Sequence, residues 1–163
     1  MRTQSLLVSL AVSCGALCST SAFAVDRSGT MAVSATLVKA CEVRGTPTLS
    51  FGSFEALASS GVREAVSSDF QVACSADATP TIFSSTPRVM SASGRNVPFS
   101  MGLSAVAAAA NALGTNAATA NPLVITQDGT LQVVPIYARI NAEDYQAQVS
   151  GSYTATVNMT VVY

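Results

Sequence analysis

The acidic side chains are the residues in this sequence with the clearest capacity for chemistry. Two carboxylates, one protonated and one ionised, are the machinery of glycoside hydrolysis. The candidates are spread along the chain and belong to no recognisable motif: Glu42, Glu55, Glu64, Asp69, Asp77, Asp128, Glu143 and Asp144. Glu143 and Asp144 are adjacent and would project in different directions, and Asp128 is explained by a turn signal. Because carboxylates are rarely buried without a partner, solvated surface charge is the better interpretation of all eight.

Composition excludes most other catalytic mechanisms. The chain has 163 residues and no His, which removes Ser/His and Cys/His catalysis and every His-ligated metal site. Lys39 is the only lysine, so a Schiff base or a P-loop has almost no candidate residue. A dyad of Lys39 with Ser34 is conceivable, but an ordinary surface lysine is the simpler interpretation. We therefore expect no enzyme activity, no cofactor and no bound metal.

The charge balance limits the partners. Charged residues make up 10% of the chain, with a formal net charge of −1, and hydrophobic residues make up 49%. So few charges argue against disorder, and their balance argues against a nucleic-acid partner. The length suits one domain with a sizeable buried core.

The first 24 residues have the three parts of a secretory signal peptide. Arg2 gives a positive start, residues 6–17 are largely apolar, and Ser21-Ala22-Phe23-Ala24 is a small-x-small cleavage site. We expect cleavage between Ala24 and Val25 and export to the periplasm, and from there to the cell surface or the medium. A lipid anchor on Cys14 or Cys18 is the alternative, but the residues before them are poor lipobox sequences.

Cleavage would leave two cysteines, Cys41 and Cys74. In an oxidising compartment they most simply form one disulfide, which would stabilise the fold by about 4 kcal/mol in the chain-entropy model. The rival interpretation, a reactive thiol, lacks the His or basic surroundings that lower a thiol pKa.

Alternation of apolar and polar residues dominates the rest of the chain and predicts short strands. Three apolar faces stand out: Phe70, Val72 and Cys74; Val97, Phe99, Met101 and Leu103; Val134, Ile136, Ala138 and Ile140. Pro135 indicates an edge or a bulge, and Asp128-Gly129 predicts a hairpin turn. Short strands separated by turn signals favour an antiparallel β-sandwich. The Ala-rich stretch 105–120 could form one or two helical turns, but without an amphipathic face we expect a surface loop.

Both ends of the expected mature chain are strand-like. Residues 153–163 alternate up to the last residue, and the larger, more apolar set is expected to face the core: Tyr153, Val157, Met159 and Val161. Met31, Val33, Ala35 and Leu37 alternate just before Cys41. Taken alone, residues 31–37 are most simply an ordinary first strand.

The chain resembles the spore coat protein U domain family, which includes archaic chaperone–usher (Csu-type) pilus subunits. The resemblance covers most of Thr30 to Tyr163. Its most specific stretches are residues 151–163 (GSYTATVNMTVVY), Leu49-Ser50-Phe51-Gly52 and residues 134–140 (VPIYARI), with Cys41 and Cys74 placed as the family's disulfide pair. The departure is residues 104–123, which lack the family's aromatic residues and Trp-Gly pair.

This resemblance implies an incomplete immunoglobulin-like β-sandwich of six strands, with the seventh supplied by another molecule. It divides the chain into a signal peptide (1–24), a donor-strand extension (25–38) and a pilin domain (39–163). Met31, Val33, Ala35 and Leu37 would be donated to a neighbouring subunit, in a groove beside Tyr153, Val157, Met159 and Val161. The implied partners are a periplasmic chaperone, an outer-membrane usher and neighbouring subunits, in a pilus that supports adhesion and biofilm formation.

Two alternatives within this interpretation stay open. A secreted coat or matrix protein of the same fold would not need an usher. A tip adhesin would carry a receptor-binding domain in place of the extension, and the length of the chain favours a shaft or adaptor subunit instead.

Overall fold

The computed structural model describes residues 30–57, 61–109 and 112–163. The compact unit is Leu37–Tyr163, and the unit before it ends at Thr36. The predicted signal peptide, the cleavage site at Ala24 and Val25, and residues 25–29 of the predicted extension lie outside the described residues. None of the helices in the described ranges is long and apolar enough to cross a membrane.

The described chain is almost entirely β-structure, and the predicted all-β class is confirmed. The strands are β1 (Cys41–Arg44), β2 (Arg63–Ser67), β3 (Gln71–Cys74), β4 (Thr81–Phe83), β5 (Val89–Ala92), β6 (Arg95–Pro98), β7 (Ser100–Gly102), β8 (Asn121–Pro122), β9 (Gln132–Val133), β10 (Ile136–Ile140) and β11 (Thr160–Val162). The helices are α1 (Ala105–Ala109), the 3₁₀ turn η1 (Ala117–Thr119) and α2 (Ala142–Tyr145).

One side of the sandwich is built from β1, β2, β3, β7, β9 and β10. β2 pairs with β10, and β3 pairs with β9, so two long runs of chain lie antiparallel. From Ser67 to Gln71 the β2–β3 run advances four residues, whereas the opposite run advances three, from Ile136 to Val133. The extra residue therefore forms a bulge within residues 68–70, opposite Pro135, which cannot donate to a ladder. β1 adds to the outer edge of β3, and β7 to the other edge of β10.

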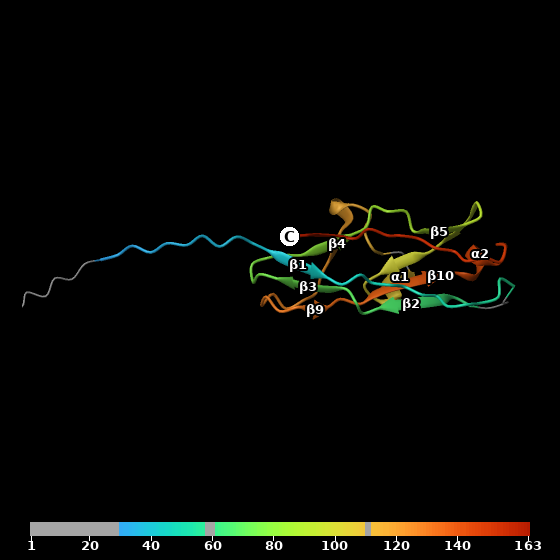
Figure 1. Cartoon of the computed structure of the whole chain (residues 1–163), viewed down its shortest axis with the longest axis horizontal. Coiled ribbons are helices and arrows are strands. Elements are labelled where there is room, and N and C mark those ends of the chain that lie inside the picture. Colours follow the sequence, from blue (N-terminus) through green and yellow to red (C-terminus); the bar gives the residue numbers. More distant parts are fainter. Residues whose placement is uncertain (1–29, 58–60, 110–111) are drawn as a thin grey trace, which may run out of the picture. The chain divides into compact units, whose positions relative to one another are not determined.

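The other side contains β4, β8 and the C-terminal run. β11 pairs with β4, which also pairs with β8, and Ser91 of β5 forms an isolated bridge with Thr154. In Figure 1 this C-terminal run, coloured red, passes beside β4 and β5 and ends at the C-terminus. β5 and β6 form a hairpin, after which the chain crosses to β7 on the first side. The short strands therefore combine into six runs of chain (β1; β2–β3; β4–β5; β6–β7; β9–β10; residues 153–163) with β8 beside them.

The predicted apolar faces form the core. Val72, Met101 and Ile140 are fully or nearly fully buried, and every member of the three sets is buried except Leu103, which is half-buried. Each of these runs alternates, so one face turns inward and its polar neighbours mostly turn outward.

Two local expectations differ from the structure. Residues 105–120 are not a plain loop, because α1 packs against β7 and β10 and buries Ala108. Asp128 accepts hydrogen bonds from Thr130, which lower the pKa of its carboxyl. However, this turn does not join a hairpin: it connects β8, which pairs with β4, to β9, which pairs with β3.

Candidate functional site

A long groove runs along one edge of the sandwich between two segments that are mostly not in strands. It has an inner part of about 280 Å³ and an outer part of about 970 Å³, and four residues line both: Leu49, Phe51, Met90 and Tyr153. One wall is residues 47–57, which follow β1, and the other is residues 148–159, which lead to β11. From here on, "the groove" means these two parts together.

The inner part opens onto the core. Its floor is made by buried Phe99, Met101 and Ile136. Phe51 meets Phe99 edge to face, with ring centroids 6.3 Å apart. Met101 and Ile136 belong to the paired strands β7 and β10, and Met90, which also lines this part, belongs to β5 on the other side of the sandwich. An apolar group in this part would therefore complete the packing of the core.

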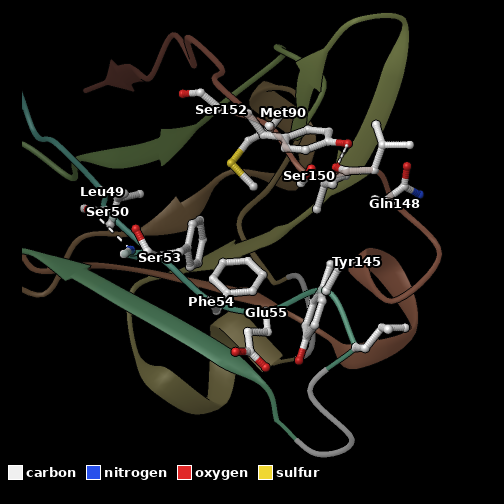
Figure 2. A pocket seen from close by; sticks show the side chains of 18 residues that line it. Leu49, Ser50, Ser53, Phe54, Glu55, Met90, Tyr145, Gln148, Ser150 and Ser152 are labelled. Carbon is white, nitrogen blue, oxygen red and sulfur yellow. Dashed lines mark hydrogen bonds between the residues drawn. The ribbon is translucent and has the colours of Figure 1, made fainter.

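The outer part is wider and mixes aromatic and polar side chains. Phe54 packs on Tyr145 with ring centroids 4.9 Å apart, and the Arg63 guanidinium lies 5.0 Å from the Phe54 ring centroid. Figure 2 shows the rings of Phe54 and Tyr145 turned toward each other, with the Met90 thioether across the hollow. The Tyr145 hydroxyl donates to the carbonyl of Gly61 at 2.7 Å, which fixes the ring at this end.

The wall formed by residues 148–159 offers backbone groups for pairing. Thr154 exchanges two backbone hydrogen bonds with Ser91, and the Asn158 N–H donates to Thr86 Oγ1, all toward the β4–β5 side. In extended chain, successive residues point their N–H and C=O groups to opposite edges. The groups of Tyr153, Ala155 and Val157 therefore face the groove, and no backbone–backbone hydrogen bond between described residues joins the two walls.

The predicted terminal-strand residues lie together on one side of their segment. Tyr153, Val157, Met159 and Val161 are half-buried and pack against the core, whereas Thr154, Thr156, Asn158 and Thr160 are exposed. Tyr153, Val157 and Met159 line the groove, and Val161 lies beyond it in β11. Only residues 160–162 of the expected long strand are paired as a strand, because before them the pairing with the β4–β5 side is reduced to the single bridge between Thr154 and Ser91.

The residues of the predicted donor segment have no such packing. Met31, Val33 and Leu37 are 84%, 80% and 93% exposed, Ala35 is also exposed, and residues 30–40 form no helix or strand (Figure 1). Large apolar side chains that alternate in an unpacked segment can gain stability only by burial elsewhere. Their role as donor residues stays a prediction.

A disulfide fixes the chain just after this segment. Cys41 and Cys74 are bonded across β1 and β3, and Ala40 exchanges hydrogen bonds with Ser75, its backbone N–H donating to Ser75 Oγ at 3.2 Å. The bond therefore holds the edge strand from which the groove wall 47–57 continues. Lys39 is exposed immediately before this anchor.

The groove lining carries one charged residue, Glu55, which is exposed and has no ion pair within the described part of the chain. The other candidate carboxylates lie elsewhere and are exposed, except half-buried Asp144. Within the described ranges, no three His, Cys, Asp or Glu side chains gather as metal ligands would. A groove with an apolar inner part, a single charged lining residue and backbone groups directed into it has the properties needed to bind an extended peptide.

Sequence reasoning did not find the wall 47–57 or Met90, which lines both parts of the groove, as site residues. Phe51 and Phe54 are three residues apart, so they give no alternating signal, and only the resemblance drew attention to residues 49–52. A Pro-and-Gly-interrupted segment with regularly spaced aromatic residues was the available clue.

Two comparisons with known proteins bear on this chain. The sequence model of the Spore Coat Protein U domain matches residues 27–160, which is more than half of the chain. Among proteins of curated function, none matches the chain significantly.

Proposed function

The chain belongs to the Spore Coat Protein U domain family, and we propose that it is a structural subunit of a surface pilus that polymerises by donor-strand exchange. In this proposal residues around Met31–Leu37 of one copy fill the groove of the next copy. A periplasmic chaperone occupies the groove before assembly, and an outer-membrane usher catalyses the exchange. The subunit belongs to the shaft or to an adaptor, and the pilus supports adhesion and biofilm formation.

The observation that supports this function best is the groove with its unpaired backbone. Tyr153, Ala155 and Val157 present N–H and C=O groups to a hollow whose floor is the hydrophobic core. The same chain carries an exposed segment in which apolar side chains alternate. A strand edge next to an apolar cleft is a template for strand addition, and donor-strand complementation between chaperone and pilin is an established case of it.

Chain length argues that the donated segment enters another molecule. The tether of residues 38–40 spans at most ~14 Å between Leu37 and Cys41. Cys41 precedes the inner part of the groove, and the wall 47–57 continues from there over up to ~35 Å. A donor strand antiparallel to residues 153–159 would have Leu37 at the outer end, whereas Cys41 precedes the wall that begins at the inner part; we infer that so short a tether favours the groove of another copy. A contact between different patches of successive copies produces a fibre when the rotation between copies does not close into a ring.

Deletion of residues 25–37 tests the proposal. The shortened protein is expected to form no multimers, whereas the full chain gives a ladder on an unheated SDS gel that collapses to monomer on heating, because strand-complemented fibres dissociate very slowly. Chaperone binding should survive the deletion, because the groove is intact. A deletion variant that still gives the ladder would contradict the donor-strand function.

Val33→Asp gives a second, finer test. It would place a charge in an apolar groove with no partner for it. Surface pili at the normal level from this variant would show that Val33 does not enter the groove. Ser34→Asp, one residue along on the opposite face of the extended segment, is the matched control.

A further inference from the structure

We propose a second contact between successive copies, in which the tether of the donor copy packs on the rim of the acceptor's groove. The rim is the pair Leu57 and Val149, and its occupants are Val38 and Lys39 of the next copy. This inference rests on the proposed donor-strand function and adds to it a specific surface outside the donated strand.

The rim is an apolar pair left exposed where the groove is widest. Leu57 and Val149 come from the two opposite walls, both line the outer part of the groove, and they are 86% and 50% exposed. The Tyr153 hydroxyl donates to the Val149 carbonyl at 2.9 Å, which holds that side of the rim in place. The rim is continuous with the proposed strand-binding surface.

The direction of the donated strand brings the tether to this rim. Every strand pair between the named strands is antiparallel. An added strand that continues this pattern beside residues 153–159 runs from the inner part to the outer part. Its last residue, Leu37, then lies at the outer end, and Val38 follows directly.

Successive side chains of an extended segment point to opposite faces, and this limits what Val38 can contact. If Leu37 points into the groove, Val38 points away from it, and in the free chain Val38 is 78% exposed. Among the described residues that line that end of the groove, Leu57 and Val149 are exposed apolar side chains that Val38 could contact. Because residues 38–40 span at most ~14 Å before the disulfide-anchored Cys41, the body of the donor copy must also lie close to the rim.

Charge complementarity supports the same arrangement. Lys39, the only lysine of the chain, follows Val38, and Glu55, the only charged residue lining the groove, lies on the wall that carries Leu57. Both side chains are exposed in the single copy, and Glu55 forms no ion pair with another described residue. An ion pair between copies would orient the contact rather than supply most of its affinity.

Dissociation of multimers measures the rim contact. The readout is the half-life of the SDS-resistant ladder of the full-length chain at a fixed elevated temperature. Leu57→Ser and Val38→Ser are each expected to shorten it by roughly fivefold, as loss of a partly buried apolar contact implies. The double variant should be no worse than either single variant, because both remove one contact. Val124→Ser, at an exposed valine that lines neither part of the groove, should leave it unchanged.

Exchange of the two charges of the ion pair gives a further test. A general loss of stability would not be restored by the second substitution, whereas loss of the ion pair would be. Lys39→Glu is expected to shorten the half-life roughly twofold, and Lys39→Glu with Glu55→Lys should restore it. Additive losses for Leu57→Ser and Val38→Ser, or no loss at all, would overturn the rim contact while the ladder itself persists. Absence of any ladder from the unmodified chain would instead contradict the donor-strand function.

Discussion

The direction of individual side chains along residues 153–159 determines what each contributes to the groove. Val157 is half-buried, packs against the core and lines the inner part, whereas neighbouring Thr156 is exposed. The hydrogen bonds of Thr154 and Asn158 toward the β4–β5 side fix this alternation. A shift of the pairing register by one residue would turn every side chain of the segment to the opposite face.

Replacement of Val157 by Ser should therefore weaken strand binding. A synthetic peptide of residues 30–38 is the probe, and its affinity for the chain lacking residues 25–37 is the measurement. We expect a loss of roughly tenfold, since a buried apolar side chain is replaced by a polar one. Thr156→Ala is the control on the opposite face and should leave the affinity unchanged; equal losses in both variants would mean that Val157 does not face the peptide.

Arg88 is a residue whose role concerns stability. It is buried, and its guanidinium donates to the carbonyls of Leu113 and Gly114, at 3.1 Å for Gly114. Burial lowers the pKa of Arg88 from its ordinary value. Leu113 in turn donates its N–H to Met101, so Arg88 ties the segment after α1 to the core.

We expect Arg88→Met to lower the free energy of unfolding by about 2–3 kcal/mol, because two buried carbonyls lose a charged donor. Urea unfolding of the secreted chain measures it. Arg95→Met, at an exposed arginine, should change stability by no more than ~0.5 kcal/mol. A similar small effect at Arg88 would show that water replaces the guanidinium at these carbonyls.

At the scale of elements, the chain just after β1 determines where the groove wall of residues 47–57 begins. Gly45 has a φ of +87°, and a Cβ there would lie 1.7 Å from the Asp69 carbonyl oxygen. This close approach holds the start of the groove wall against the turn between β2 and β3. A side chain at position 45 cannot be accommodated without displacement of the backbone.

Gly45→Ala is therefore expected to destabilise the chain by about 3 kcal/mol or more, through both the left-handed conformation and the clash. Gly52→Ala is the matched control, because Gly52 has a φ of +69° but no atom within 4 Å of the added Cβ. It should cost only about 1 kcal/mol. Thermal or urea unfolding distinguishes the two; equal costs would show that residues 45 and 69 move apart easily.

The sequence predicted best those strands in which apolar and polar residues alternate clearly. Val134, Ile136, Ala138 and Ile140 gave a clear pattern and form the buried face of the β9–β10 run. Residues 47–57 gave none, because this wall lies outside the sheets and its aromatic side chains follow the shape of the groove. Asp128-Gly129 was correctly a turn but wrongly a hairpin, since local turn chemistry does not specify which strands pair.

At the scale of the whole molecule, the proposed function treats the groove of one copy and the exposed segment of another as the two halves of one contact. The core of the sandwich is open along the inner part of the groove, and Met31, Val33 and Leu37 are largely exposed. Polymerisation would satisfy both needs at once, so the fibre should be far more resistant to unfolding than the monomer.

A cysteine pair between the segment and the groove tests this claim most directly. Val33→Cys and Val157→Cys are introduced into one chain, with Met159→Cys and Tyr153→Cys as alternative partners to sample the register. The account predicts, for at least one of these pairs, a ladder that resists heating in SDS and collapses with reductant, whereas Val33→Cys with Thr156→Cys gives none. Monomer alone from every pair, linked internally or not linked, would contradict exchange of the segment between copies.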